Sequence, residues 1–227
     1  MKVVAMIPIK MNNQRLPGKN VKVFSDGTPL VELIQRACIN ASNVDEVYIY
    51  CSSEEIKPYV IDGVKFLKRP IQLDSDDVNC NDIIQEFMKE VDADIYVVSH
   101  ATGPFTQSKS IDTCIGMLKT GKYDSAFLAS CIQQFLWSEG QAINFDVQHF
   151  PRTQDLAPIY IEAPGAYVFQ RETFNKYNRR VGVKPYIHCI SEIEGRDIDN
   201  LEDFLIADAI YTSIIRPGIM GENNETR

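Results

Sequence analysis

The sequence predicts an α/β protein with one mostly parallel, Rossmann-like sheet that is covered by helices on both faces. Short runs rich in β-branched and aromatic residues, each bounded by turn residues, alternate with segments that carry an apolar stripe at helical spacing. Repeated strand–helix–strand units of this kind build a parallel sheet whose connecting helices pack on its two faces.

The strand predictions follow the β-branched and aromatic runs in order along the chain. They cover residues 3–9, 47–51, 64–67, 95–99 and 125–129, followed by 166–170 and a last strand near 186–190.

The helix predictions rest on apolar residues that share one face. Helices are expected over residues 30–38, 83–91 and about 110–120, and a final one over about 201–212. The polar segment 218–227 is predicted to be a frayed tail.

The strand–helix rhythm breaks between about residues 132 and 163. This stretch is rich in Gln, Asn and Phe and holds the only tryptophan, Trp137. We interpret it as an arm inserted into a single domain of residues 1–227, and as a candidate dimerisation element. With 227 residues, 44% of them hydrophobic, the chain is large enough for one domain with a full core.

Composition argues against several classes of protein. A net charge of −8 disfavours general binding to nucleic acid, and no apolar run approaches the roughly 20 residues that span a bilayer. The six cysteines form no Cys-x-x-Cys pair, so reduced core cysteines are favoured over a zinc site or a disulfide framework. A secretory signal is not expected at residues 1–10, and the predicted location is therefore cytoplasmic.

The loop after the first predicted strand is a candidate anion site. Residues 10–22 contain the cations Lys10, Arg15, Lys19 and Lys22, with no acidic residue before Asp26. In an open parallel sheet, ligands bind outside the carboxyl ends of the strands, and positive charge beside free backbone N–H groups suits a triphosphate. The alternative interpretation is a solvated basic loop.

Two common phosphate-binding patterns are excluded in this loop. Asn20 stands where a Walker loop needs Ser or Thr after its lysine, and the single glycine, Gly18, cannot supply a dinucleotide fingerprint. As a loop lysine, Lys19 is expected to be exposed and to contribute little to packing.

Four segments together resemble the acylneuraminate cytidylyltransferases (CMP-sialic acid synthetases). The run 7–20, IPIKMNNQRLPGKN, resembles the signature with which that family opens. Segments 68–76, 100–105 and 195–199 resemble its Arg-Pro and Ser-Asp stretch, its turn after the fourth strand and its late Asp-x-Asp. The resemblance implies a nucleotidyltransferase (GT-A-like) fold and transfer of CMP from CTP to a nonulosonic sugar acid, with release of pyrophosphate.

The resemblance also implies positions that contact the nucleotide. Lys19 is expected to act in catalysis as well as in binding. The other nucleotide-binding candidates are Lys10, Asn12, Arg15, Asn20, Asn79 and Asn81. The family usually carries arginine where this chain has Lys10, so bidentate contact with phosphate would be lost there while the charge is kept.

Asp197 and Asp199 are the candidate metal ligands and, with Lys19, the candidate catalytic residues. On an extended segment two residues that are two positions apart face the same way, and paired carboxylates suit Mg²⁺ or another divalent cation. The competing interpretation is that Asp199 and Glu202 form a helix capping box.

Sugar contacts are implied at two groups of residues. His100 stands where many relatives have glutamine, although a structural histidine is the alternative, and Glu162 and Tyr167 lie at a segment where relatives carry a basic residue. Arg152 and Gln154 match a Pro-Arg-x-Gln stretch whose arginine, in the family, reaches the neighbouring subunit. The resemblance therefore implies a homodimer with shared active sites. The acid at Glu162 indicates changed contacts with the sugar.

Several functions stay open at this level. The substrate implied is an acidic nine-carbon sugar, such as a sialic, legionaminic or pseudaminic acid. The alternatives are a nucleotidyltransferase for Kdo or an amino-sugar phosphate, a glycosyltransferase that uses Asp-x-Asp, and a non-catalytic nucleotide-binding module. Release of pyrophosphate from CTP in the presence of sugar separates these classes.

Overall fold

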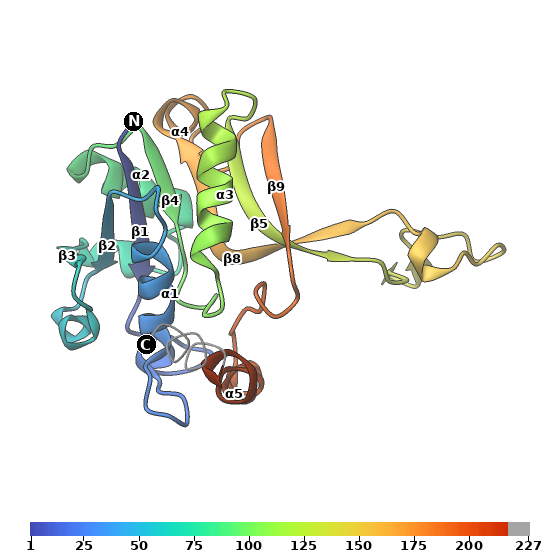
Figure 1. The fold of residues 1–227 in the computed structure, drawn as a ribbon, viewed down its shortest axis with the longest axis horizontal. Coiled ribbons are helices and arrows are strands. Elements are labelled where there is room, and N and C mark those ends of the chain that lie inside the picture. Colours follow the sequence, from blue (N-terminus) through green and yellow to red (C-terminus); the bar gives the residue numbers. More distant parts are fainter. Residues whose placement is uncertain (218–227) are drawn as a thin grey trace, which may run out of the picture.

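The computed structural model describes residues 1–217 and is built around one seven-stranded sheet (Figure 1). Its order is β3-β2-β1-β4-β8-β5-β9. The strands are β1 (Val3–Ile9), β2 (Glu46–Cys51), β3 (Val64–Lys68), β4 (Ile95–Val98), β5 (Ser125–Ile132), β8 (Ile159–Gln170) and β9 (Pro185–Ile190). Only β8 runs antiparallel to its neighbours in this sheet, which confirms the predicted mostly parallel arrangement.

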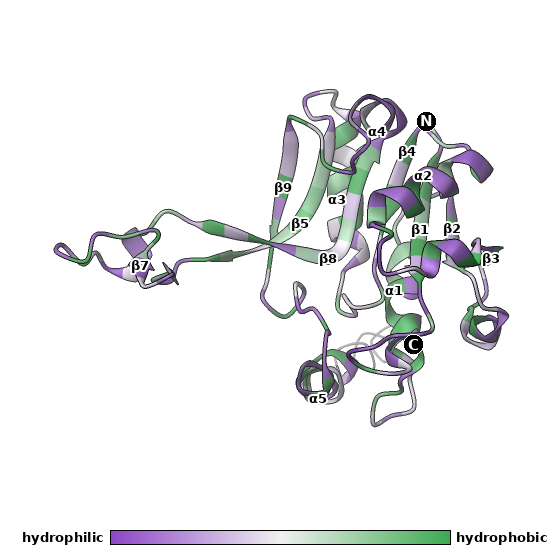
Figure 2. Ribbon diagram, turned by 180° about the vertical axis from the view of Figure 1, so that it is seen from behind, coloured by the Kyte–Doolittle hydropathy of each residue, from purple (hydrophilic) through white to green (hydrophobic). Residues whose placement is uncertain are grey.

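Helices cover both faces of the sheet (Figures 1 and 2). One face is packed by α1 (Leu30–Ile39) and α3 (Ser108–Lys119), and the other by α2 (Cys80–Glu90) and α4 (Arg171–Tyr177). The two cores form because alternate residues of β1 point to opposite faces: Val3 and Ala5 join one cluster, and Val4 and Met6 join the other.

A third, smaller core fixes the first loop against the end of the described chain. Helix α5 (Leu201–Ile210) places Phe204 against Phe24, with ring centroids 5.2 Å apart. A short π-helical turn follows at Tyr211–Ile215, and 3-10 turns lie at Lys19–Val21, Glu54–Tyr59, Ile71–Asp74 and Thr153–Asp155. The first loop is therefore packed from two directions, by the sheet and by α5.

The observed elements differ from the predicted ones chiefly at β8 and α4. The strand predicted at 166–170 begins earlier in the structure, at Ile159. The prediction missed its first residues because they are exposed and are followed by Pro164 and Gly165, which are typical of loops. Helix α4 was not predicted, since seven residues are too few to show a helical period.

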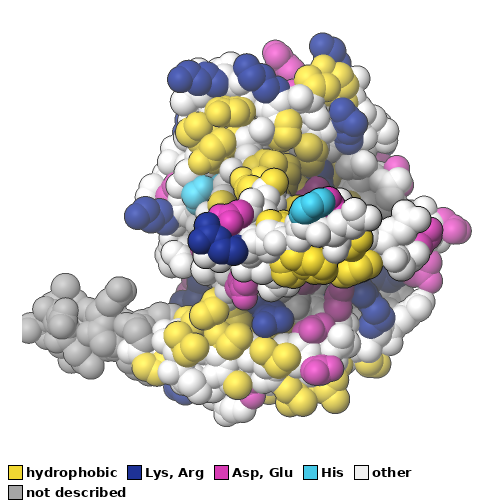
Figure 3. Space-filling view, turned by 90° about the vertical axis from the view of Figure 1, so that its right-hand side faces the viewer, with side chains coloured by type: hydrophobic (Ala, Val, Ile, Leu, Met, Phe, Trp, Pro, Cys, Tyr) yellow, Lys and Arg dark blue, Asp and Glu magenta, His cyan; other side chains and the backbone are white. Residues whose placement is uncertain are grey.

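The segment between β5 and β8 projects from the body as an arm, which we define as residues 133–158 (Figure 1). Near its tip, β6 (Trp137–Ser138) pairs with β7 (Gln141–Ala142). Four aromatic rings cluster beside this hairpin, yet Trp137 and Phe150 remain 55% and 62% exposed. Figure 3, in which the arm points toward the viewer, shows hydrophobic side chains gathered on it.

Two further predictions can be placed against the described residues. None of the helices among residues 1–217 is long and apolar enough to cross a membrane. Cys38, Cys51 and Cys114 are free and buried as expected, whereas Cys189 is free but exposed. The frayed tail predicted at 218–227 lies outside the described residues.

Candidate active site

The first loop folds back so that Lys19 is buried. Gly18 adopts a left-handed conformation, with φ of 68°, and starts the 3-10 turn that carries Lys19 inward. The Lys19 ammonium donates a hydrogen bond to the Ile198 carbonyl oxygen at 2.8 Å and lies 3.6 Å from the Asp199 carboxylate. Lys19 is only 7% exposed, so the expectation of an exposed lysine was wrong, because the segment before α5 covers it.

The other cations of the loop are held by acids from distant parts of the chain. The Arg15 guanidinium lies 2.8 Å from Asp199, and the Lys10 ammonium lies 2.8 Å from Asp76, which also accepts from the Gln14 amide at 2.8 Å. A cavity of about 410 Å³ opens among these side chains. Its lining consists of Lys10, Asn12, Asn13, Gln14, Arg15, Leu16, Lys19 and Asp76.

The fourth loop cation turns away from this cavity. The Lys22 ammonium lies 5.0 Å from the centroid of the Phe204 ring, on the side of α5. The cavity therefore collects three of the four loop cations.

Asn20 holds the shape of the loop. It is 6% exposed, and its amide nitrogen donates to the Lys10 carbonyl oxygen at 2.8 Å and to the Asn13 side chain at 3.3 Å. These contacts occupy the amide nitrogen within the loop and make Asn20 a positioning residue for Lys10.

Asn79 and Asn81 lie at the amino end of α2. The Asn79 side chain caps that helix by accepting from the backbone N–H groups of Asn81 and Asp82, and Asp82 completes the capping box. The cap occupies these N–H groups, so what favours an anion or a polar group of the ligand at this helix end is its positive dipole.

Asp197 and Asp199 flank an anchored residue in a segment without regular secondary structure. Ile198 is fully buried, and its N–H donates to the Thr102 carbonyl oxygen at 3.0 Å. Burial raises the pKa of Asp197, and the charge of Asp199 acts in the same direction.

The competing interpretation of Asp199 as the helix cap is wrong by one residue. Asn200 is the N-cap of α5 and forms a capping box with Asp203, whose carboxylate also accepts from the Asp199 backbone N–H at 3.0 Å. The Asp199 side chain is thus left to face Arg15 and Lys19.

The two aspartates suit a divalent cation that is shared with a phosphate ligand. Arg15 and Lys19 contact Asp199, whereas burial raises the pKa of Asp197, and a nearby cation would favour its ionised form. Within residues 1–217 there is no cluster of three or more His, Cys, Asp or Glu side chains able to hold a metal. Mg²⁺ tolerates this because it takes one or two carboxylates together with water and substrate oxygens.

A second group of side chains forms around Tyr167, beside the end of β4. The His100 ring meets the Tyr167 ring edge to face, with centroids 6.4 Å apart, and the Tyr167 hydroxyl donates to Glu162 at 2.7 Å. The Arg180 guanidinium stacks on the Tyr167 ring, 3.6 Å from its centroid. Burial lowers the pKa of His100 to about 4, and Arg180 and Lys19 add to this shift.

Sequence reasoning did not identify Arg180. It lies in the connection between α4 and β9, within a run that also contains Arg179, and no pattern in the sequence distinguishes the two. Only the packing of α4 on the sheet brings Arg180 over Tyr167.

Two glycines allow the turn at residues 100–105, which we call the His100 turn, to approach β8. A Cβ atom on Gly103 would lie 3.1 Å from the Gly165 backbone, and one on Gly165 would lie 2.0 Å from the Thr106 hydroxyl oxygen. The His100 backbone N–H donates to the Pro164 carbonyl oxygen at 3.1 Å. This contact sets His100 next to Tyr167.

Arg152 and Gln154 are not brought to this site by their own chain. Both lie on the arm, where the Arg152 guanidinium forms a bidentate pair with Asp155 at 2.7 and 2.9 Å. The Gln154 carbonyl oxygen lies 3.4 Å from the Gln133 amide nitrogen.

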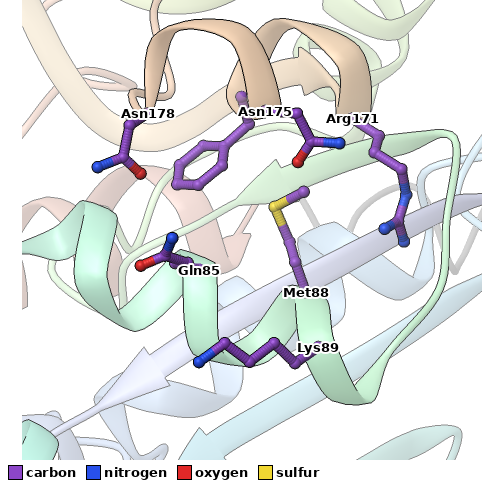
Figure 4. A pocket seen from close by; sticks show the side chains of 7 residues that line it. Gln85, Met88, Lys89, Arg171, Asn175 and Asn178 are labelled. Atoms are coloured by element: carbon purple, nitrogen blue, oxygen red, sulfur yellow. The ribbon is translucent and has the colours of Figure 1, made fainter.

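A separate cavity of about 560 Å³ lies between α2 and α4 (Figure 4). It is lined by Gln85, Met88, Lys89, Arg171, Phe174, Asn175 and Asn178. Its cations are already neutralised, Arg171 by Asp92 at 2.6 Å and Lys89 by Glu86 at 2.5 Å. It therefore lacks the concentrated charge of the first-loop cavity.

Comparison with known proteins adds a family and a fold. The family model described as "Cytidylyltransferase" matches residues 4–192. The chain is 24% identical over 231 residues to N-acylneuraminate cytidylyltransferase A of Danio rerio, covering 97% of this chain and 53% of that protein. It is 22% identical over 192 residues to 3-deoxy-manno-octulosonate cytidylyltransferase of Escherichia coli, covering 78% and 76%.

The fold has a close counterpart among solved structures. A CMP:2-keto-3-deoxy-manno-octonic acid synthetase in complex with CTP superposes with a TM-score of 0.70 at 20% identity, covering 93% of this chain and 99% of that one. This likeness confirms the predicted nucleotidyltransferase fold. The chain spans about half the length of the N-acylneuraminate cytidylyltransferases that it matches.

Proposed function

Because the chain belongs to the cytidylyltransferase family, we propose that it transfers CMP from CTP to a nonulosonic, sialic-acid-like sugar acid and releases pyrophosphate. The observation that carries the proposal is the meeting of Lys19 and Arg15 with Asp199 beside the first-loop cavity. Cations for a triphosphate are then in contact with a carboxylate for a divalent metal. The sialic-acid and Kdo activities named for the relatives favour a sugar acid as acceptor.

The chain's own residues divide the work of binding CTP. Lys10, Arg15 and Lys19 face the cavity and would neutralise the phosphate oxygens, while Asn20 keeps the loop in shape. Lys19 is pre-positioned by its bond to Ile198, so little side-chain freedom is lost when phosphate binds.

The reaction is an in-line displacement at the α-phosphorus of CTP. The anomeric hydroxyl oxygen of the sugar forms a bond to that phosphorus, the bond from phosphorus to the bridging oxygen breaks, and pyrophosphate leaves. The hydroxyl proton passes to solvent. Little covalent chemistry falls to the protein, so its contribution is positioning and stabilisation of charge.

We include a divalent cation, with Mg²⁺ the first choice, in this proposal. Asp197 and Asp199 would hold it, since they lie on either side of Ile198 and Asp199 contacts the loop cations Arg15 and Lys19. When bound, the ion supplies charge neutralisation at the phosphate oxygens and lowers the pKa of a hydroxyl that coordinates it.

The arm supports a homodimer with shared active sites as part of the same proposal. It exposes Trp137, Ile143 and Phe150 at 55%, 59% and 62%, an apolar surface of the kind that associates. Arg152 lies on this arm, which projects away from the body of its own chain (Figure 1), and would reach the site of a second copy. The six free cysteines of the described residues favour a reducing, cytoplasmic location.

A second acceptor is favoured by one specific observation. The superposed CTP complex and the Escherichia coli relative are both named for an eight-carbon 3-deoxy acid. Both sugar classes carry a carboxylate beside the anomeric carbon, so the same residues could accept either.

The test is release of pyrophosphate from a panel of nucleoside triphosphates and sugars in the presence of Mg²⁺. We expect release only with CTP, and only with an ulosonic acid. Equal rates with amino-sugar phosphates would redirect the proposal, and CTP binding without turnover for any sugar would leave a nucleotide-binding module.

A further inference from the structure

We infer that Arg180 binds the carboxylate of the acceptor sugar and so selects acids over neutral sugars. This inference rests on the proposed function and extends it to a residue outside the four family-like segments. Arg180 lies between α4 and β9, and its side chain is 24% exposed.

The guanidinium lies over an aromatic ring and beside the Cys80 side chain, and it has no close carboxylate partner among the described residues. Its central carbon lies 3.6 Å from the centroid of the Tyr167 ring, a cation–π contact that restricts the side chain. The nearest facing carboxylate oxygen, on Glu162, is 3.9 Å away, which is beyond hydrogen-bond distance. Glu162 instead accepts the Tyr167 hydroxyl at 2.7 Å.

A partly buried guanidinium of this kind is complementary to a planar, two-oxygen anion. Arginine forms paired, parallel hydrogen bonds to a carboxylate, and these are stronger where water is partly excluded. An ulosonic acid carries such a group, and a neutral sugar does not.

The position of Arg180 suits the chemistry that the first loop requires. The His100 ring and the Arg180 guanidinium both lie against the Tyr167 ring, and Ile198 joins Lys19 to the turn that follows His100, since its carbonyl oxygen accepts from Lys19 and its N–H donates to Thr102. In a 2-ulosonic acid the carboxylate and the anomeric hydroxyl are attached to the same carbon. Binding the carboxylate at Arg180 would therefore hold the attacking hydroxyl on the His100 side of the phosphate cavity.

Arg180 also accounts for the acid at Glu162. An unpaired negative charge would repel an acidic sugar. The Glu162 carboxylate, however, accepts a hydrogen bond from Tyr167, and the positive charge of the nearby Arg180 guanidinium compensates its negative charge. Glu162 is left as an acceptor for sugar hydroxyl groups.

The test pairs changes in the protein with changes in the sugar. Wild type and Arg180→Gln are assayed for pyrophosphate release with the accepted sugar acid, and the C1 amide of the same sugar is measured as a competitive inhibitor. We expect Arg180→Gln to raise the KM for the acid by about 10- to 100-fold, the range for losing charge-assisted hydrogen bonds, and to leave the KM for CTP unchanged. The inhibition constant of the amide should change by less than about threefold.

Arg179→Gln is the matched control, because the neighbouring arginine points elsewhere, with its central carbon 5.5 Å from the Tyr177 ring and one nitrogen 3.4 Å from the Gly182 carbonyl oxygen. It should leave the KM for the sugar acid unchanged. Arg180→Lys keeps the positive charge but cannot form paired hydrogen bonds to a carboxylate, so it should give an intermediate KM. This variant also tests the inference if Arg180→Gln does not fold.

The possible results separate this inference from the proposed function. An equal loss for acid and amide, or no loss for either, overturns the role of Arg180 while CMP transfer stands. A raised KM for CTP with an unchanged KM for the sugar would assign Arg180 to phosphate and also overturn it. If wild type uses no sugar acid at all, the proposed function fails and this inference fails with it.

Discussion

The Lys19 ammonium donates a 2.8 Å hydrogen bond to the Ile198 carbonyl oxygen and so joins two segments that lie 179 positions apart in the chain. Ile198 is itself anchored to Thr102 through its backbone N–H. The first loop, the His100 turn and the Asp197–Asp199 segment are therefore held together before any ligand binds, and one buried lysine serves both the fold and the site.

Replacing Lys19 by alanine should reduce both stability and turnover. The Ile198 carbonyl group would lose its partner in a buried setting, which costs about 1–3 kcal/mol of unfolding free energy. Chemical denaturation measures that loss, and pyrophosphate release measures turnover. Lys22→Ala serves as the control, since Lys22 packs on Phe204 outside the cavity. An unchanged unfolding free energy for Lys19→Ala would contradict the buried contact.

Asp197→Asn and Asp199→Asn should each weaken the Mg²⁺ dependence of activity. Removing either carboxylate takes away an oxygen ligand with its charge, and Mg²⁺ activation curves would move to higher concentration. Neither change should remove the cap of α5, which belongs to Asn200.

Asn200→Ala is the matched variant for that distinction. It should lower the unfolding free energy by about 1 kcal/mol through the lost cap and leave Mg²⁺ activation near normal. Normal Mg²⁺ activation in Asp199→Asn together with impaired activation in Asn200→Ala would contradict this assignment.

His100→Gln should make stability less sensitive to acid. The pKa of His100 is lowered to about 4, against 6.5 in an unfolded chain, so between these values the unfolded state takes up a proton that the folded state refuses. Wild type therefore loses stability as pH falls from 6.5 toward 4, and glutamine removes this loss. Melting temperatures at pH 7 and pH 5 test the prediction: the difference between the two proteins should shift in favour of glutamine at pH 5. A constant difference would mean that His100 titrates normally.

Mixed dimers test the shared site. Arg152→Ala and Asp197→Ala homodimers should both be nearly inactive if Arg152 acts on the partner. After subunit exchange about half of the dimers are mixed, and each has one intact site, so activity should recover to roughly a quarter of wild type. Mass spectrometry confirms the exchange. Exchange without recovery would place Arg152 in the site of its own chain, and a fully active Arg152→Ala homodimer would place it outside the site altogether.

Gly165→Ala should destabilise the protein, because its Cβ atom would lie 2.0 Å from the Thr106 hydroxyl oxygen. Overpacking of this kind costs about 1–3 kcal/mol. Gly116→Ala in α3 is the control, since nothing lies within 4 Å of its Cβ position, and it should stabilise by up to about 1 kcal/mol. Equal melting temperatures for the two variants would show that the His100 turn can move away from β8 at little cost in stability.

Local chemistry made much of this protein predictable. The buried runs and helical stripes determine the strands and helices of the sheet, because period and burial leave few other solutions. The cations at Lys10, Arg15 and Lys19, with no acid among them, indicate an anion site at the carboxyl end of β1. The segments that resemble the family point to the same loop.

Tertiary structure decided the features that depend on distant neighbours. Lys19 is buried because the segment before α5 crosses the first loop. In the same segment the Ile198 N–H donates to Thr102, and Asn200 rather than Asp199 caps α5. Arg180 resembles Arg179 in the sequence, yet the seating of α4 on the sheet places Arg180 on Tyr167 and Arg179 on Tyr177. Sequence patterns record the face on which a residue lies, while the partner that it meets depends on how separate elements pack against one another.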